Sequence, residues 1–365
     1  MADEQANRGA FLIQQSYCAA NAAPVYGRMC AAVAAGLTRA TTIGRRILDW
    51  PGEPTRDALP LRFFGGLHAL VQAGQDAGLA SVYAGAVTDQ AAIVAILERV
   101  LAEHEAALLP WLDGPPQTNE PGRSAALMLG LLEIARRHGS KLELLEIGSS
   151  AGLNLLIDRY RFDLGGTVLG PADSPVTITP VWKGPPAMAV PLDIVSVRGC
   201  DVAPLDATDP AVAARLAAYV WPETPERLAR VRAAIAMLRM QGVSLDRADA
   251  ADWIEARLAE PQPAGVTRVL MHSVVWQYLP ENVAERVRVA MQAAGARATA
   301  ERPLGWVMME PDRAFGHQTI RVRSWPGTGE WATVATAHAH GTWIDTAGEA
   351  GAAVVALPEA ARIRV

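Results

Sequence analysis

The 365-residue sequence contains few cysteines, namely Cys18, Cys30 and Cys200. They are too few and too scattered for a disulfide framework or a zinc knuckle, which need several cysteines at short spacing. We therefore expect reduced thiols, as in most cytoplasmic proteins. His338 and His340 lie two apart on a predicted strand and would face the same side. No third ligand lies near them in the sequence, so we predict no metal site.

The sequence also lacks an excess of basic residues and any long apolar run. Its formal net charge is −5 and its isoelectric point is near 5.9, whereas a protein that neutralises nucleic-acid phosphates needs a basic face. No apolar run reaches the roughly 18 residues that span a bilayer. The start, MADEQANRGAF, lacks the basic and then apolar order of a signal peptide. These absences predict a soluble cytoplasmic protein that binds neither nucleic acid nor membrane.

Half of the residues are hydrophobic and 19% are charged, which is typical of a chain with a sizeable core. Up to about residue 132, apolar residues recur at three- and four-residue spacing, and this period predicts amphipathic helices. Breaks rich in proline and glycine separate the helical stretches, the last one at residues 113–122. We predict an all-helical N-terminal cap domain over residues 1–122 and a second domain over residues 123–365.

From Leu142 onward, strand and helix signals alternate, which predicts a mostly parallel sheet with helices on both faces. The five candidate strands are residues 143–148, 193–202, 242–249, 267–275 and 305–311. Two more strand-like runs, 319–327 and 330–345, are joined by turn residues and predict a C-terminal antiparallel hairpin. Residues 160–191 are rich in glycine and proline, and we expect them to form an inserted loop or small hairpin over the sheet.

The segment LELLEIGSSAGLNLLIDRY, starting at Leu142, predicts a buried strand, a turn and the first turns of a helix. Glu146 closes the strand, and Gly148 and Gly152 bracket the turn. Such turns bring backbone N–H groups and a helix N-terminus close to a nucleotide-like ligand. Tight packing without a ligand would explain the glycines equally well. Glu146 can meet a ligand amine or local N–H groups, and Asn154 can meet a ligand carboxylate or begin the helix.

The order of these elements resembles the class I S-adenosylmethionine-dependent methyltransferase fold, a Rossmann-like arrangement. EIGSSAGLNL, at residues 146–155, is similar to the family's glycine-rich first motif, which cradles the methionine part of the cofactor. The resemblance covers roughly residues 140–345 and implies S-adenosylmethionine as the cofactor. The cofactor-binding residues that it implies are Glu146, Gly148, Ser149, Ser150, Gly152, Asn154, Asp201, Asp249, Ala250, His272 and Ser273.

Two acidic positions carry the nucleoside part of this resemblance. Asp201 sits where the family's acidic residue binds the ribose hydroxyls, a role that suits carboxylate oxygens; alternatively, it organises the turn that follows. Asp249 and Ala250 sit where the family contacts the adenine. The sequence departs from the family pattern in two ways. Ser150 replaces the middle glycine of the first motif, and the insertion separates Glu146 from Asp201 by far more than the usual roughly 20 residues.

LMHSVVWQYLP, at residues 270–280, resembles the fourth strand and the motif that lines the reacting methyl group. His272 falls at the carboxyl end of this strand and can act as a base, because histidine as a residue type ordinarily titrates near operating pH. Alternatively, it is hydrogen-bonded within the strand–loop junction. The predicted substrate pocket consists of Trp276, Gln277, Tyr278 and Glu310. The first three of these can instead pack beneath the following helix.

At a finer level, DRYRFDLGG, DSPV, WKGPP, GCDVAPLD and HSVVWQYLP resemble a bacterial family known as domain of unknown function 2332, over almost the whole chain. That resemblance implies the architecture and no activity. Our leading hypothesis is an S-adenosylmethionine-dependent methyltransferase-like enzyme that methylates an unidentified acceptor, which we expect to be a small molecule. The alternatives are an adenosyl-cofactor-binding sensor without methyl transfer and a nucleotide-dependent enzyme of another class. A dehydrogenase fingerprint would need glycines at Ser150 and Leu153. The sequence leaves the oligomeric state open.

Overall fold

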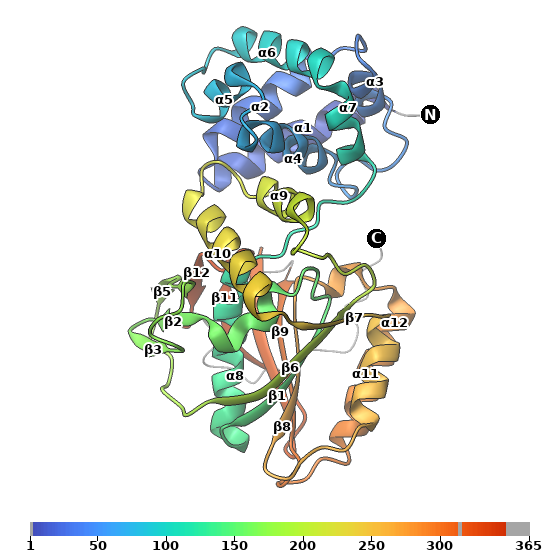
Figure 1. Cartoon of the computed structure of the whole chain (residues 1–365). Helices are drawn as coiled ribbons and strands as arrows, with labels where there is room; N and C mark the ends of the chain where they lie inside the picture. Colours follow the sequence, from blue (N-terminus) through green and yellow to red (C-terminus); the bar gives the residue numbers. More distant parts are fainter. Residues whose placement is uncertain (1–2, 313–315, 348–365) are drawn as a thin grey trace. The chain divides into compact units, whose positions relative to one another are not determined.

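The structure, a computed structural model, describes residues 3–312 and 316–347. The chain divides into two compact units. The first comprises residues up to 118 together with residues 209–232, and the second comprises the remaining residues (Figure 1). We expected a single boundary near residue 122. Instead, residues 209–232 leave the second unit for the first, and residues 119–122 belong to the second.

The first unit consists of helices, as the apolar spacing predicts. Several of them begin at a side chain that accepts a backbone N–H, for example Asp3, Thr41, Asp76 and Asp89. The α-helices are α1 (Glu4–Ala20), α2 (Pro24–Gly36), α3 (Thr42–Leu48), α4 (Leu59–Gln72), α5 (Ala77–Tyr83), α6 (Gln90–Glu103), α7 (Glu105–Leu108) and α9 (Pro210–Ala218). A 3-10 helix, η1 (Leu109–Leu112), follows α7, and α10 (Pro225–Gln241) begins in this unit and ends in the second.

Residues 209–232 join the first unit through specific contacts. Nδ1 of His68, on α4, lies 3.0 Å from the carbonyl oxygen of Ala218, at the end of α9. The carboxylate of Glu223 accepts the backbone N–H groups of Val25 and Tyr26 at the start of α2. These bonds satisfy groups that a helix end leaves unpaired, so the segment is an integral part of the helical unit.

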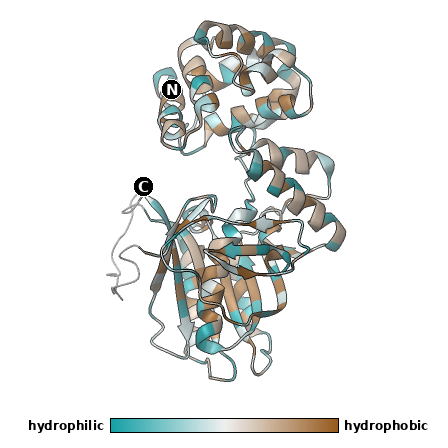
Figure 2. Ribbon diagram, turned by 90° about the vertical axis from the view of Figure 1, so that its left-hand side faces the viewer, coloured by the Kyte–Doolittle hydropathy of each residue, from teal (hydrophilic) through white to brown (hydrophobic). Residues whose placement is uncertain are grey.

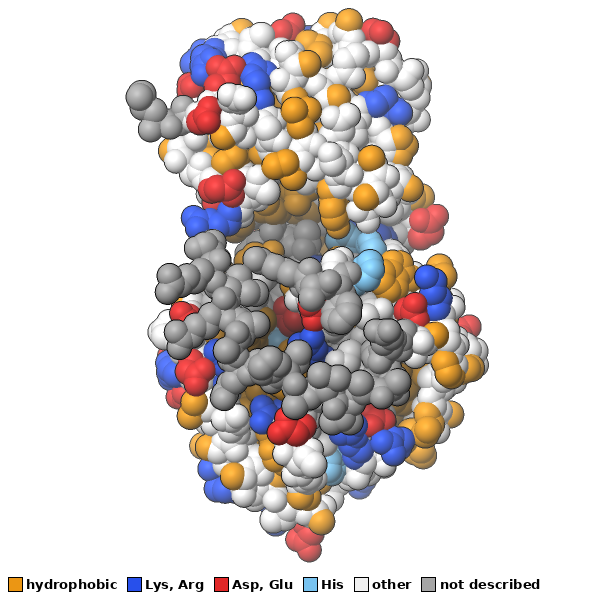
Figure 3. Space-filling view, turned by 180° about the vertical axis from the view of Figure 1, so that it is seen from behind, with side chains coloured by type: hydrophobic (Ala, Val, Ile, Leu, Met, Phe, Trp, Pro, Cys, Tyr) orange, Lys and Arg blue, Asp and Glu red, His pale blue; other side chains and the backbone are white. Residues whose placement is uncertain are grey.

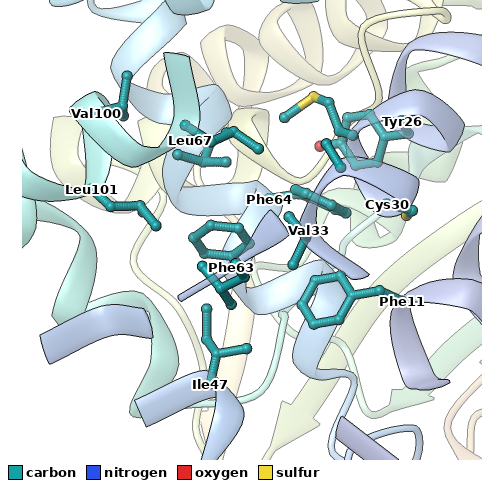
Figure 4. Packing of buried hydrophobic residues seen from close by; sticks show 14 of the residues in the cluster. Phe11, Tyr26, Cys30, Val33, Ile47, Phe63, Phe64, Leu67, Val100 and Leu101 are labelled. Atoms are coloured by element: carbon teal, nitrogen blue, oxygen red, sulfur yellow. The ribbon is translucent and has the colours of Figure 1, made fainter. Parts of the chain in front are cut away.

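An aromatic and aliphatic core fills the first unit (Figure 4). The rings of Phe11 and Phe64 meet edge to face with centroids 5.8 Å apart, and Tyr26 meets Phe64 at 5.1 Å. Leu67 is completely buried beside them. This unit therefore has a hydrophobic core of its own, as expected of a domain.

The second unit is built on a nine-stranded sheet with the order β5-β12-β11-β10-β9-β8-β1-β6-β7. The strands are β1 (Lys141–Ile147), β5 (Val181–Lys183), β6 (Asp193–Asp201), β7 (Ser244–Arg247), β8 (Thr267–Ser273), β9 (Leu304–Asp312), β10 (His317–Trp325), β11 (Ala332–Ala337) and β12 (Trp343–Asp345). The five strands predicted to be parallel pair in parallel. β10 and β11 form the predicted antiparallel hairpin, so the mixed, mostly parallel sheet is confirmed.

Helices cover both faces of this sheet. α8 (Ser124–His138) packs on β8, β9 and β10, and α11 (Ala250–Ala259) with α12 (Glu281–Gly295) lies on the opposite face (Figure 1). Gly130 allows α8 to approach the sheet closely, since a Cβ atom there would lie 2.4 Å from Val307. Hydrophobic residues are concentrated along the central strands (Figure 2), and β8 is buried over its whole length.

The connection from β1 to β6 differs from the expected crossover helix. It begins with the 3-10 helix η3 (Leu153–Arg159) and continues into a small sheet of β2 (Arg161–Leu164), β3 (Thr167–Leu169) and β4 (Thr177–Ile178). The predicted hairpin within residues 160–191 is present as the β2–β3 pair. The predicted α-helix after the turn is absent, and the Leu155 N–H donates to the Gly152 carbonyl three residues earlier, as in a 3-10 helix. The Leu153 N–H donates to the Asn119 side chain, and the Tyr160 hydroxyl donates to the Leu153 carbonyl.

The prediction of one strand over residues 330–345 was wrong in its length. A turn at residues 338–341 divides it into β11 and β12. The Gly341 N–H donates to the His338 carbonyl, and Gly341 has a φ of 68°. His338 and His340 therefore lie in a turn and do not share one face of a strand, contrary to our expectation.

Positively and negatively charged side chains are interspersed with one another on the face drawn in Figure 3. In the first unit, for example, Arg39 pairs with Glu4 at 2.5 Å and with Asp49 at 2.8 Å. Exposed pairs of this kind contribute little to stability. None of the described helices combines the length and the apolar character that crossing a membrane requires.

Candidate functional site

The carboxyl ends of the parallel strands bring together residues far apart in the sequence. Glu146 is on β1, Asp201 ends β6, His272 is on β8 and Glu310 is on β9. The register pairs Glu146 with Met271, and His272 stands opposite the residue two before Glu310. The chain proceeds outward from β1 through β6 to β7 and then returns to β8 on the other side of β1. Open α/β sheets bind ligands at such a switch point.

The turn after β1 has an unusual backbone. Gly148, Ser150 and Gly152 all have positive φ angles, of 69°, 55° and 78°. Serine rarely adopts this left-handed conformation, and the Ser150 N–H donates to Oδ2 of Asp201 at 2.8 Å. The Ser149 N–H donates to the Cys200 carbonyl on the same neighbouring strand. The turn is therefore tied to the end of β6.

Packing alone accounts for both glycines of this turn. A Cβ atom on Gly148 would lie 2.2 Å from the side chain of Val275, and one on Gly152 would lie 2.9 Å from Val243. Their positive φ angles also favour glycine. The packing explanation is thus sufficient for these glycines, and the case for a ligand must come from other residues.

Glu146 is such a residue. Its side chain is 1% exposed, and its Oε2 atom has no hydrogen-bond partner. Burial raises the pKa of the Glu146 carboxyl from 4.5 to about 7, although the nearby polar side chains of Ser149 and Asn154 act in the opposite direction. Asp201 raises this pKa further and Arg123 lowers it. A buried carboxyl with one open oxygen costs free energy unless a partner binds there.

Asn154 influences the charge of Glu146 and does not cap an α-helix. Its Oδ1 atom accepts the hydroxyl of Ser124 at 2.8 Å, and both side chains are buried. Asn154 also lowers the pKa of the Glu146 carboxyl, the direction expected of a polar neighbour. A hydrogen bond thus joins the start of α8 to the polar surroundings of Glu146.

Sequence reasoning missed the residues that lead into α8. Asn119, Glu120 and Arg123 are all buried, although the first two belong to a stretch that we interpreted as a break between helices and Arg123 directly follows it. Asn119 accepts the Leu153 N–H at 2.7 Å, and Nε of Arg123 donates to the Ala339 carbonyl at 2.9 Å. The one local signal is that charged residues directly adjoin a strongly apolar helix.

Asp201 organises its own turn, as one of the two interpretations proposed. One oxygen accepts the Ser150 N–H, and the other accepts the Ala203 N–H at 2.9 Å. A carboxylate offers about four acceptor positions, so each oxygen can accept one further hydrogen bond. The side chain is half-buried, and the predicted contact with ribose hydroxyls stays a prediction.

Asp249 is the N-cap of α11. Its carboxylate accepts the N–H groups of Ala251 at 2.8 Å and Asp252 at 3.3 Å. Ala250 is buried in the core on this face of the sheet, and Ser273 is buried at the end of β8. The adenine contact predicted for Asp249 and Ala250 stays a prediction.

His272 and Glu310 form a buried pair. Nδ1 of His272 lies 2.7 Å from Oε1 of Glu310. The same oxygen accepts the Val275 N–H at 3.1 Å, and Oε2 accepts the Trp276 N–H at 3.3 Å. The histidine is therefore hydrogen-bonded within the strand–loop junction, and the carboxylate of Glu310 accepts hydrogen bonds from groups of the protein itself. Nε2 of His272, however, is buried without a partner.

The three residues at 276–278, after β8, differ in how far they are buried. Trp276 stacks on the imidazole of His272 with centroids 5.1 Å apart and planes at 23°, and its ring lies 5.6 Å from that of Trp306. Gln277 is exposed and Tyr278 is 73% exposed. The three residues form the 3-10 helix η4 (Trp276–Tyr278), which precedes α12. Trp276 therefore covers the buried histidine, while its two neighbours face solvent.

A family model described as "Uncharacterized protein conserved in bacteria (DUF2332)" matches residues 8–346. The chain belongs to this family. The match extends over both units and agrees with the finer resemblance noted from the sequence. No curated protein and no solved structure gives a significant match.

One group of three potential metal ligands is found among the described residues of the DUF2332 chain, in the first unit: Asp76, Glu103 and His104. Arg99 already donates to Asp76 at 2.7 and 2.8 Å and to Glu103 at 2.5 Å. These hydrogen bonds lower the pKa of Asp76 to about 2. The guanidinium supplies the positive charge that a metal would supply, so an ion-pair network explains the group.

Proposed function

We propose that this DUF2332 protein is an S-adenosylmethionine-dependent methyltransferase-like enzyme that acts on a small molecule. The observation that carries the proposal is the buried Glu146 carboxyl, whose open Oε2 lies at the end of β1 beside a left-handed turn. Buried polar atoms of native proteins are nearly always paired. The order of β7, β6, β1, β8 and β9 also supports it, since doubly wound nucleotide-binding sheets use the same order.

The residues fit the chemical groups of this cofactor. Its ammonium would donate to Oε2 of Glu146 and supply the opposite charge that the buried carboxyl lacks. Its ribose hydroxyls would donate to Asp201, whose two oxygens each keep a free acceptor position beside the backbone N–H groups they hold. Arg123 is close enough to influence the charge on Glu146, so the amino-acid end would meet both signs of charge.

When bound, S-adenosylmethionine supplies an electrophilic methyl group on a sulfonium. The protein's own contribution is to position the reactants and exclude water. His272 would serve as the base where the acceptor carries a proton. Glu310 accepts its Nδ1–H and so leaves Nε2 as the proton-accepting atom. Glu310 is then a positioning residue, because it acts on the acceptor only through His272.

The connection after β1 favours this cofactor over a dinucleotide or ATP. Pyrophosphate-binding folds place the phosphates at the N-terminus of an α-helix that follows the glycine-rich turn. Here the turn leads into the 3-10 helix η3. S-adenosylmethionine has no phosphate and does not need such a helix. A cofactor-binding protein without methyl transfer remains the second candidate, motivated by the complete burial of His272.

Calorimetric titration with S-adenosylhomocysteine, S-adenosylmethionine, NAD and ATP tests the proposal. We expect the adenosyl ligands alone to bind, with Kd values on the order of micromolar, or about 8 kcal/mol. Glu146→Gln should weaken them at least tenfold, whereas Glu255→Gln on the surface of α11 should not. A folded wild-type protein that binds none of them, or that prefers NAD, would contradict the proposal. Turnover with a trial acceptor separates an enzyme from a sensor.

Proton release on binding is a second measurement, and it tests whether the ammonium group of the ligand lies beside Glu146. If the ligand ammonium pairs with Glu146, binding will lower the pKa of the Glu146 carboxyl and release a fraction of a proton near pH 6.5. Titrations in two buffers of different ionisation enthalpy measure this release. It should be absent in Glu146→Gln and with 5′-deoxy-5′-methylthioadenosine, which lacks the amino-acid end. Equal proton release by both ligands would place the amine elsewhere.

A further inference from the structure

Two adjacent rings in the second unit carry nitrogen atoms that the protein leaves unpaired. His272 is fully buried and Trp306 is 1% exposed. Nε2 of His272 and Nε1 of Trp306 both lack a hydrogen-bond partner. Native proteins seldom leave such atoms unpaired, and each case calls for a water or a ligand. The two rings are neighbours that meet at 60° with centroids 6.1 Å apart, so both unpaired nitrogens belong to one aromatic cluster at the end of β8.

The two nitrogens have opposite hydrogen-bonding roles. Glu310 accepts two backbone N–H groups as well as Nδ1 of His272, so it acts as an acceptor and the imidazole proton is on Nδ1. Nε2 of His272 is then an acceptor, whereas the indole Nε1–H of Trp306 is a donor only. A hydroxyl group donates one hydrogen bond and accepts others, and it satisfies both atoms. A carboxylate only accepts and an ammonium only donates, so neither satisfies the pair.

The surroundings favour a hydroxyl on an aromatic ring. The ring of Trp276 lies nearly parallel to the imidazole and 5.6 Å from Trp306. Trp276 is half-buried and begins η4. The two residues that follow it are exposed, whereas the imidazole of His272 beneath its ring is buried. A shift of this ring would open His272 to an aromatic molecule, whose own ring would then pack against Trp276 and Trp306 as aromatic rings commonly do.

We propose that Nε2 of His272 and Nε1 of Trp306 bind the hydroxyl group of an aromatic acceptor, a phenol, under the ring of Trp276. As a methylation site this rests on the proposed function. His272 accepts the hydroxyl proton as the O–H bond breaks, and the phenol oxygen forms the new bond to the methyl group. The bond from methyl to sulfur breaks, and its electron pair stays on the sulfur. Glu310 stabilises the imidazolium, which later loses its proton to water.

Three small probes with matched rings test the site without the true acceptor: phenol, aniline and toluene. The indole N–H signal of Trp306, assigned with Trp306→Phe, is followed by NMR in the wild-type protein with and without S-adenosylhomocysteine. We expect phenol to shift this signal and to bind about tenfold more tightly than toluene, the effect of one added hydrogen bond. Equal binding of phenol and toluene, or no shift with any probe, would mean that the two nitrogens hold a water only and would overturn the proposal.

Variants identify the atoms. In His272→Asn the side-chain N–H can still donate to Glu310, but the acceptor corresponding to Nε2 is lost, so phenol should bind no better than toluene. Trp331→Phe changes a ring 5.0 Å from Trp306 and removes neither nitrogen, so phenol binding should persist. Phenol discrimination without any binding of S-adenosylhomocysteine would refute the proposed function and leave the hydroxyl site standing. The reverse result would refute the hydroxyl site alone.

Discussion

At the scale of the residue, the charge of Glu146 and the stability of the fold are opposed. Burial raises the pKa of the Glu146 carboxyl to about 7 from 4.5, so the native state holds a proton that the unfolded chain releases over this range. The contribution of this group to stability is therefore fully present below about pH 4.5 and is lost as pH rises to 7. The loss amounts to about 3 kcal/mol at most.

Glu146→Gln removes this titration. We expect the variant to be more stable than the wild type at pH 8, by up to about 3 kcal/mol, and nearly equal to it at pH 4.5. Urea unfolding at several pH values measures the difference. A gain in stability together with a loss of S-adenosylhomocysteine binding is the pattern of a residue kept for function. A variant that is less stable at both pH values would show that the carboxylate is a structural partner of its neighbours.

At the scale of the element, Asp249 has a capping role that can be separated from a ligand role. Asp249→Ala deletes the acceptor at the start of α11 and should lower the free energy of unfolding by about 1 kcal/mol. Asparagine caps helices as well as aspartate, so Asp249→Asn should stay within about 0.5 kcal/mol of the wild type. Urea unfolding checks both values. If the carboxylate contacts the adenine, Asp249→Asn will weaken S-adenosylhomocysteine binding at unchanged stability.

The elements predicted from sequence are those with an undisturbed hydrophobic period. The strands β1, β6, β8 and β9 and the hairpin partner β10 fall where the apolar runs place them. The 3-10 helix η3 was not foreseen, because its contacts leave no local pattern: the Leu153 N–H, for example, donates to the side chain of Asn119, 34 residues earlier. The break between β11 and β12 likewise depends on a turn that packs on Gly122, since a Cβ at Gly341 would lie 2.1 Å from the Gly122 carbonyl.

In the candidate site, too, the positions of residues along the strands could be predicted, but their distant partners could not. Strand ends are visible in the sequence, so Glu146, Asp201 and His272 could be placed at one edge of the sheet. Their partners could not be, because hydrogen bonds between neighbouring strands leave no local pattern. Glu310 was expected in the pocket, which stays a prediction, but its contacts with His272 and two backbone N–H groups were not foreseen. Ser124 went unnoticed, although its buried hydroxyl donates to Asn154, which influences the charge of Glu146.

At the scale of the whole molecule, the two units share one chain in an interleaved way. Residues 209–232 leave the second unit between β6 and β7 and complete the first. Stability should follow the units and not the order of the sequence, because cooperative unfolding follows shared contacts. A mutation in the first core will then act on two segments more than ninety residues apart.

Leu67→Ala tests this. Leu67 is completely buried in the first core, and its truncation should cost about 2–5 kcal/mol. In hydrogen exchange followed by mass spectrometry, we expect protection to fall together in residues 3–118 and in α9, while β1, β8 and β9 keep wild-type protection. Leu270→Ala in the second core is the matched control and should give the opposite pattern. If α9 followed β1 and not α4 in both variants, residues 209–232 would belong energetically to the second unit, because hydrogen exchange reports the unit whose opening exposes each amide.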